Sequence, residues 1–191
     1  MDRLCSLEDK SCGGCCCIEV PEDRREKLVP LFRLRRGAYA SHLRGERNIN
    51  EYERQLATSE ELLSIDTLGR TLEKKCHYLG FLNEEETRVG CLAHPDMNEG
   101  RDLRDCGFYK SARTCQDFFC AAAEIYARFT TEQQRWFRIS IRSWDWYDLS
   151  DQDQTYATIT NFRDALPTIQ ERIREGMSDE EVAGTLSELL S

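Results

Sequence analysis

The sequence predicts a mainly α-helical fold in which an irregular, cysteine-rich region packs on a C-terminal helical scaffold. Two observations support this prediction: all ten cysteines of the 191-residue chain lie before residue 121, and the segment that follows carries apolar residues at helical spacing. We expect a cysteine-rich metal-binding region over residues 1–120 and a helical extension over residues 121–191, the two forming one domain. A chain of this length can bury an adequate apolar core, so it does not need cysteines merely to fold.

Charged helical sequence begins at about Glu22. Pro30 should interrupt this helix or begin its second part, because an interior proline removes a backbone donor and clashes with the preceding turn. A further helix is predicted to start at the capping box Thr58-Ser59-Glu60-Glu61 and to end near Gly69.

The segment from Cys76 to Cys120 is rich in glycine and contains one strand-like stretch, around residues 87–92. Its apolar side chains are few. We therefore expect a loop that would pack poorly without a cross-link, and a bound metal is the natural cross-link.

The C-terminal part is predicted to be helical throughout. A first apolar stripe has helical spacing and consists of Phe118, Ala122, Ile125, Tyr126 and Phe129. Residues 130–133 should stop that helix and cap the next, whose stripe continues through Trp136, Ser140, Ser143, Trp144 and Tyr147. Another helix should end at Gly176, and residues 178–181 should cap the last one.

The composition indicates in which compartment the protein works and which classes of partner it can bind. The first ten residues, MDRLCSLEDK, lack the basic start and apolar run of a secretory signal, and no apolar stretch approaches the roughly 20 residues that span a bilayer. We expect a cytoplasmic protein without a membrane partner, whose thiols are kept reduced and serve metal binding or redox chemistry. The net charge of −9 argues against a nucleic-acid partner, and a basic stretch over residues 24–47 is interpreted as solvated helix surface.

The strongest local pattern is Cys12-Gly13-Gly14-Cys15-Cys16-Cys17. Two residues between thiolates let both sulfurs reach one metal, and the glycines permit the tight backbone. Adjacent thiols point in different directions, so we interpret Cys17 as a packing residue. A second set lies about sixty residues later, and a centre built from both sets predicts that Cys12, Cys15, Cys76 and Cys91 lie close together.

Histidine offers further candidate ligands. Cys91-Leu92-Ala93-His94 repeats the two-residue spacing with a nitrogen that suits zinc better than a cluster. A hydrogen-bonded structural role is the alternative for His94, and more so for His42 and His77.

The CGGCC motif at residues 12–16, the C-x14-CLAHP motif at residues 76–95 and the C-x4-C motif at residues 115–120 together resemble the YkgJ-type CxxCxxCC family, described as zinc- or iron-chelating. The resemblance covers roughly the first 120 residues and implies an eight-cysteine metal core. The opening cysteine of the family pattern falls at Asp9 here, with Cys5 displaced from it. The metal ligands that we predict are Cys12, Cys15, Cys16, Cys76, Cys91, Cys106, Cys115 and Cys120.

Two functions follow as hypotheses. The first is a metal-binding module for zinc or iron, including an iron–sulfur cluster, which stores, delivers or senses the metal or presents a surface to a protein partner. The second is an iron–sulfur redox or protein-modifying enzyme, because domains of the resembled family occur in flagellin lysine-N-methylases. Its pocket would be lined by Tyr78, Phe81, Tyr109 or the stripe from Trp136 to Tyr147, although such aromatics are more often core residues. Cysteines that serve only as buried apolar residues, or as disulfides outside the cytosol, are the structural alternative.

Overall fold

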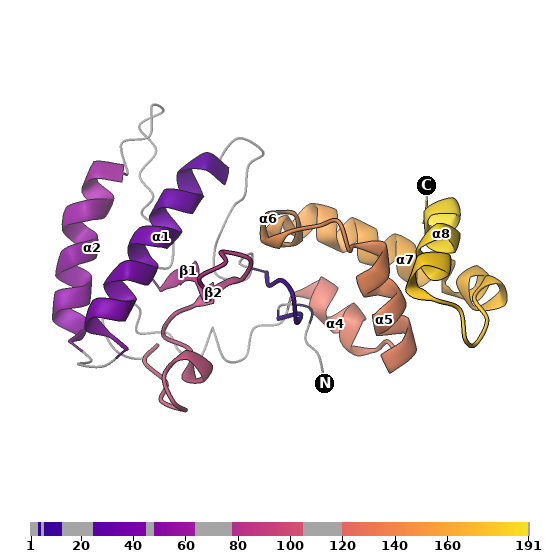
Figure 1. Cartoon of the computed structure of the whole chain (residues 1–191), viewed down its shortest axis with the longest axis horizontal. Coiled ribbons are helices and arrows are strands. Elements are labelled where there is room, and N and C mark those ends of the chain that lie inside the picture. The colour runs from indigo at the N-terminus through magenta and orange to yellow at the C-terminus, as the bar shows by residue number, and fades with distance from the viewer. Residues whose placement is uncertain are drawn as a thin grey trace.

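A computed structural model of the chain describes residue 4 and residues 6–12, 25–44, 48–63, 78–104 and 120–190. Within these residues it contains seven α-helices and one two-stranded sheet, which confirms the mainly α class. Residues 25–44, 48–63 and 78–104 form one half of the molecule and residues 120–190 form most of the other, side by side along the longest axis (Figure 1). No helix in these ranges combines the length and the apolar character needed to cross a bilayer.

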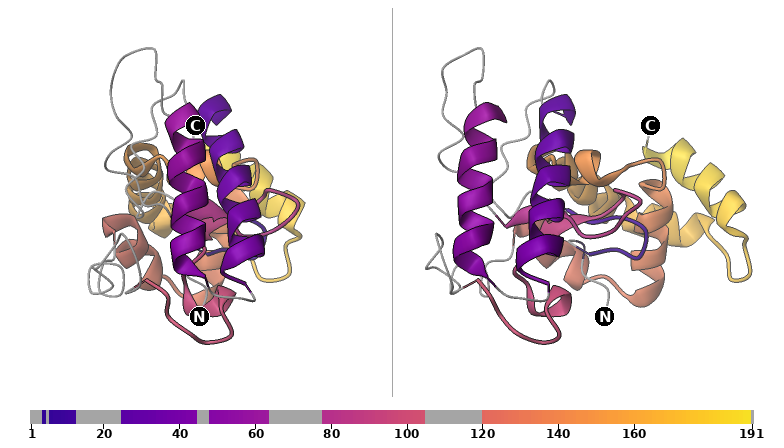
Figure 2. Two further views of the ribbon diagram at one scale, coloured as in Figure 1. Left: turned by 90° about the vertical axis from the view of Figure 1, so that its left-hand side faces the viewer. Right: turned by 60° about the vertical axis from the view of Figure 1, so that its left-hand side comes forward.

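Two helices frame the N-terminal half, α1 (Arg25–His42) and α2 (Ile49–Leu63). They pack side by side (Figure 2). The buried residues of α1 recur every three or four positions, as in an amphipathic helix: Leu28, Leu31, Phe32, Arg35, Ala38 and Tyr39.

Two expectations for this half are wrong. Helix α1 continues through Pro30, which is exposed and lies near the N-terminal end, where few helical hydrogen bonds precede it. Helix α2 begins at Ile49, not at Thr58, because the Asn48 side chain accepts the Glu51 N–H at 3.1 Å and caps the helix there. The expected helix end near Gly69 lies outside the described residues.

The strands β1 (Leu79–Phe81) and β2 (Val89–Cys91) pair antiparallel, with Leu79 opposite Cys91 and Phe81 opposite Val89. The expected strand-like stretch at residues 87–92 is confirmed, whereas β1 was not predicted. Gly80 lets α1 approach β1 closely, since a Cβ there would meet the Leu92 side chain at 2.9 Å and Arg35 Cβ at 3.4 Å.

The hairpin is well packed, so the expectation of a poorly packed loop is wrong for residues 78–104. Its apolar side chains join those of α1 and α2 in what we call the first core: Leu28, Leu31, Phe32, Ala38, Tyr39, Leu43, Tyr52, Leu56, Tyr78, Leu79, Phe81, Val89, Leu92, Ala93, Leu103 and Trp146. Burial on both helices and both strands stabilises this half through ordinary hydrophobic packing.

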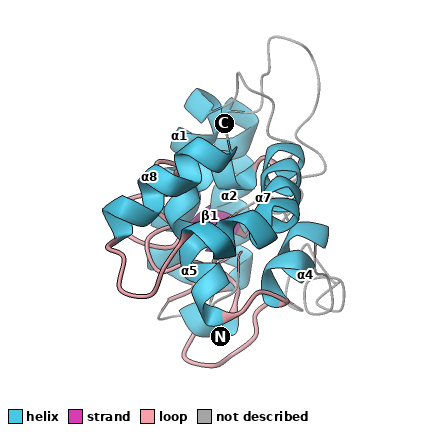
Figure 3. Ribbon diagram, turned by 90° about the vertical axis from the view of Figure 1, so that its right-hand side faces the viewer, coloured by secondary structure: helices cyan, strands magenta, loops and turns pink. Residues whose placement is uncertain are grey.

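The C-terminal half consists of five helices: α4 (Ala121–Ala127), α5 (Thr131–Ser140), α6 (Trp146–Ser150), α7 (Gln152–Arg172) and α8 (Asp179–Leu190). Figure 3 looks onto this half, with the strands behind it. The cap before α5 is confirmed as a full capping box between Thr130 and Gln133, and the cap before α8 is confirmed by reciprocal hydrogen bonds between Ser178 and Glu181.

Apolar side chains of these helices form what we call the second core: Leu4, Leu7, Ala122, Ala123, Tyr126, Phe129, Trp136, Phe137, Ile139, Ile141, Leu149, Ile159, Phe162, Ile169, Ile173, Val182 and Leu186. The first predicted stripe is confirmed over its described members. The second is wrong beyond Ser140, because α5 ends there and Asp145 caps a new helix. Helix α7 ends at Arg172, and Gly176 (φ +88°) lies in the turn that follows.

The two cores interlock. Leu4 and Leu7, at the start of the chain, are buried in the second core. Trp146, from α6, is buried in the first core, with its ring centroid 5.5 Å from that of Phe32 and 5.6 Å from that of Phe81. The C-terminal half therefore supplies Trp146 to the first core, and the N-terminal segment supplies Leu4 and Leu7 to the second.

We predict that Trp146→Ala lowers the free energy of unfolding by about 3–5 kcal/mol, the usual cost of emptying an aromatic site in a core. The matched control is Tyr156→Ala, since Tyr156 is 48% exposed, and it should change the free energy by less than about 0.5 kcal/mol. Urea denaturation followed by circular dichroism measures both. Equal effects of the two variants would show that Trp146 does not join the halves.

Candidate metal centre

The structure describes three of the eight predicted ligands, Cys12, Cys91 and Cys120, and each is half-buried. The other five lie outside the described residues: Cys15, Cys16, Cys76, Cys106 and Cys115. Cys5, Cys17 and His77 lie outside them as well. The predicted proximity of Cys12, Cys15, Cys76 and Cys91 therefore stays a prediction, and the structure bears on it through the surroundings of the three described thiols.

Cys12 ends the N-terminal segment, residues 6–12, which doubles back on itself through a bridge between Ser6 and Ser11. The Ser11 hydroxyl donates to the Val89 carbonyl of β2 at 2.6 Å, whereas Cys12 packs against the second core. Side chains alternate in an extended chain, so this segment presents one side to the hairpin and the other to the C-terminal helices. Figure 1 shows it between the two.

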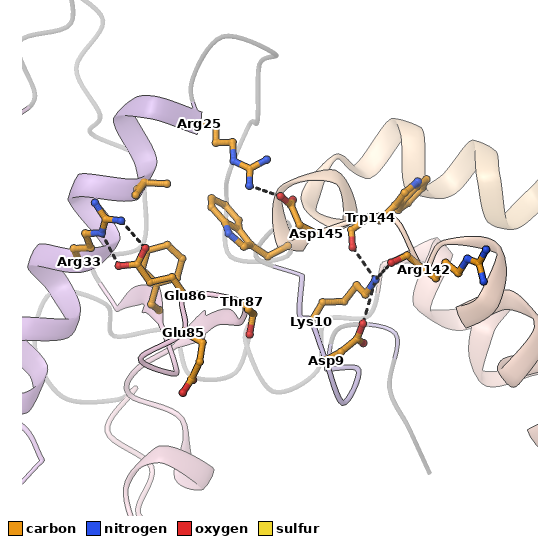
Figure 4. A pocket seen from close by; sticks show the side chains of 13 residues that line it. Asp9, Lys10, Arg25, Arg33, Glu85, Glu86, Thr87, Arg142, Trp144 and Asp145 are labelled. Carbon is orange, nitrogen blue, oxygen red and sulfur yellow. Dashed lines mark hydrogen bonds and ion pairs between the residues drawn. The ribbon is translucent and has the colours of Figure 1, made fainter. Parts of the chain in front are cut away.

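Lys10, on the same side of the segment as Cys12, is only 4% exposed. Its ammonium group donates to three backbone carbonyls, those of Ile141 at 3.1 Å, Arg142 at 3.3 Å and Trp144 at 2.7 Å. Figure 4 shows the bonds to Arg142 and Trp144. These carbonyls follow the end of α5, where carbonyl groups lack intrahelical partners and the helix dipole is negative. Sequence reasoning missed this residue, because a lysine after two acidic residues is typical of a solvated surface.

Cys91 is the last residue of β2 and packs against the first core. Cys120 is the N-cap of α4, and its Sγ accepts the backbone N–H of Ala123 at 3.4 Å. This hydrogen bond fixes the direction of the Sγ at the start of α4.

Two of the three described thiols pack against one core, and the third packs against the other. Cys12 and Cys120 are far apart in the sequence, yet both pack against the second core. Ser11, next to Cys12, is bonded to the strand that ends at Cys91. Among the described residues, no three His, Cys, Asp or Glu side chains gather into a group that could hold a metal ion. A complete site would need thiols from outside the described ranges.

Two histidines have structural roles. His94 Nδ1 accepts the Asp96 backbone N–H at 3.2 Å and caps the 3-10 helix Pro95–Met97, which places the ring proton on Nε2. His42 shares a 2.8 Å hydrogen bond with Gln55 and joins α1 to α2. Both observations favour the structural alternative over metal ligation.

A cavity of about 470 Å³ lies between the halves, among the N-terminal segment, α1, the β1–β2 turn and the α5–α6 loop (Figure 4). Its charged side chains include two ion pairs. Arg25 pairs with Asp145 and lies over the Trp146 ring, 5.9 Å from its centroid. Arg33 donates to both carboxylate oxygens of Glu86, at 2.5 and 2.7 Å. These pairs join α1 to the α5–α6 loop and to the hairpin turn.

The hydrogen bond from Arg33 holds the pKa of Glu86 below its usual range. Glu86 also has a positive φ of 58° at the tip of the hairpin, so the ion pair fixes a turn that its backbone alone would not favour. Of the aromatic residues proposed above for an enzyme pocket, Phe81 and Trp144 line this cavity, whereas Tyr78 and Trp136 are buried in the cores. Tyr109 lies outside the described residues.

Comparison of the chain with models of known families, with curated proteins and with solved structures found no match.

We predict that Glu86→Gln destabilises the protein at neutral pH and that this effect disappears on acidification. The folded pKa of Glu86 lies below its unfolded value, so its contribution is complete above about pH 4.3, the ordinary glutamate pKa, and is lost as the pH falls through the folded pKa. Urea midpoints of wild type and variant from pH 7 to pH 3 measure this. Exposed Glu85 is the control: Glu85→Gln should follow wild type at every pH, and a pH-independent effect of Glu86→Gln would contradict the prediction.

Proposed function

We propose that this protein chelates zinc or iron through its cysteines, with iron bound as an ion or as an iron–sulfur cluster. The bound metal organises the cysteine-rich segments between the packed elements of the fold. Since the ligands are thiolates, the protein would work where thiols stay reduced, as in the cytosol.

The observation that carries this proposal is that Cys12, Cys91 and Cys120 each lie half-buried at the edge of a core. The three come from different parts of the chain, and the N-terminal segment links their surroundings: it packs into the second core with Cys12 and Cys120 and bonds to β2, which ends at Cys91. Each thiol is half-buried, as a ligand at the edge of a core would be. The segments that contain Cys15, Cys16, Cys106 and Cys115 begin or end next to Cys12 or Cys120, and the segment that contains Cys76 ends just before β1, the strand paired with β2.

The donor set fits both metals. Thiolates are the soft ligands that zinc and iron–sulfur clusters prefer, and each such site takes about four of them. Eight cysteines therefore suffice for two four-coordinate ions, or for one cluster with thiols to spare. The C-terminal helices fit the role of a scaffold, since the sequence has no Cys or His after Cys120.

Anaerobic purification followed by elemental analysis and a visible spectrum tests the proposal. We expect at least about one zinc or iron per chain, colourless for zinc and brown with sulfide for a cluster. A control in which all ten cysteines are alkylated under denaturing conditions should bind none. Wild-type protein that stays metal-free, even after reconstitution with Zn²⁺ or with Fe²⁺ and sulfide under reducing conditions, would falsify the proposal.

Cys120 offers a sharper test, because a serine there keeps the helix cap while removing the sulfur. Cys120→Ser should leave the free energy of unfolding of the metal-free protein within about 1 kcal/mol of wild type and lower metal affinity by about tenfold or more. Cys120→Ala removes both the cap and the ligand, so it should lower both quantities. Competition with a chromophoric chelator gives the affinity. Unchanged affinity in Cys120→Ser would remove Cys120 from the ligand set.

A further inference from the structure

The loop between α5 and α6, residues 141–145, carries the chain from the second core toward the first. It ends at Asp145, whose side chain caps α6. The next residue, Trp146, is buried in the first core, with its ring against that of Phe81. The conformation of these five loop residues therefore decides whether Trp146 reaches the opposite half of the molecule.

Lys10 supplies the contacts that hold this loop. Its ammonium donates to the carbonyls of Ile141, Arg142 and Trp144, and the Trp144 N–H itself donates to the Ile141 carbonyl at 3.0 Å. A buried ammonium is stable only when its donors are satisfied, and Lys10 is 4% exposed. The loop is thus wrapped around a cation that cannot leave without losing three acceptors.

We propose that Lys10 and the α5–α6 loop form a latch between the two halves. The Lys10 ammonium holds the loop in the conformation that inserts Trp146 into the first core, and release of the ammonium frees Trp146 from that core. This conformational device does not depend on metal binding and goes beyond the chelating function proposed above.

The two ends of the latch meet on one pair of residues in the hairpin. Ser11, next to Lys10, donates to the Val89 carbonyl of β2, and Trp146 packs against Phe81 of β1. Val89 and Phe81 are partners in the strand register. The contacts therefore close a ring that runs from Lys10 through Ser11, the two strands and Trp146 back to the loop, so breaking one of them weakens the others.

The same ring forms part of the wall of the cavity between the halves. Lys10, Trp144 and Trp146 line one side of it and Phe81 lies on the other (Figure 4). The Arg25–Asp145 ion pair also crosses this cavity, but its arginine is half exposed, and exposed ion pairs contribute little. The buried ammonium and the buried indole are the contacts on which the closed arrangement depends.

Fluorine NMR of full-length protein labelled with 5-fluorotryptophan and kept reduced tests the latch. The chain has three tryptophans, so three signals are expected, each assigned by a Trp→Phe variant. Lys10→Met should move the Trp146 signal to its position in unfolded protein for more than about 10% of the molecules. The signal of Trp136, which is buried in the second core, should not move.

Two further variants sharpen this experiment. Lys10→Arg still donates to carbonyls and should recover part of the closed population. The matched control Asp9→Asn removes only the ion pair to an exposed carboxylate and should give the wild-type spectrum. A Trp146 signal that is unchanged in Lys10→Met would overturn the proposal.

A double-mutant cycle measures the coupling directly. If Lys10 acts by holding Trp146 in place, Lys10→Met should lower the urea midpoint in a Trp146→Ala background by less than about half of its effect in wild type. Additive effects of the two substitutions would show that Lys10 and Trp146 stabilise the protein separately, and the latch would be wrong.

Hydrogen exchange on wild type keeps the proposal testable even if Lys10→Met does not fold. The amides of Trp144 and Tyr147 bond within the loop and its cap. They should exchange through one shared opening, with the same dependence on urea, and at a lower free energy than the amide of Phe162 in α7. Exchange of both amides only with global unfolding, as for Phe162, would contradict the latch.

Discussion

The buried ammonium of Lys10 joins the start of the chain to the end of α5, and much of the fold follows from that contact. Carbonyl groups past a helix end need partners, and a buried cation needs acceptors, so each satisfies the other. With Lys10 fixed, Ser11 reaches β2 and Cys12 faces the second core. The contacts of Lys10 and Ser11 thus fix the position of Cys12, the first cysteine of the motif at residues 12–17.

The two cores fix the positions of the elements that carry Cys12, Cys91 and Cys120. Trp146 joins the C-terminal half to the first core, and the N-terminal segment joins the second core through Leu7 to β2 through Ser11, so Cys91 and Cys120 lie on elements that already pack. A metal that links such thiols closes loops whose ends are already held, which reduces the entropy lost on binding. The hairpin in particular is held by its own apolar side chains.

The histidines, aromatic residues and arginines described above hold elements of the fold together. His94 and His42 use their ring nitrogens to hold a turn and a helix pair. The aromatic residues once considered for a pocket, such as Phe81 and Trp136, are core residues. In the cavity between the halves, the charges of Arg25 and Arg33 are matched by Asp145 and Glu86, which makes them structural links between elements.

The sequence by itself determined the helical class, the caps at Thr130 and Ser178, and the candidate thiols, because these depend on local spacing and on side chains that bond within a few residues. It wrongly predicted a helix break at Pro30, because burial of the rest of α1 outweighed the local effect of the proline. It also wrongly predicted a helix start at Thr58, because Asn48 caps α2 earlier in the chain. Only the tertiary structure decided the burial of Lys10 and the crossing of Trp146 into the first core. Both depend on partners more than sixty residues away, and a lysine beside Asp9 or a tryptophan beside Asp145 has the same local pattern whether it is exposed or buried.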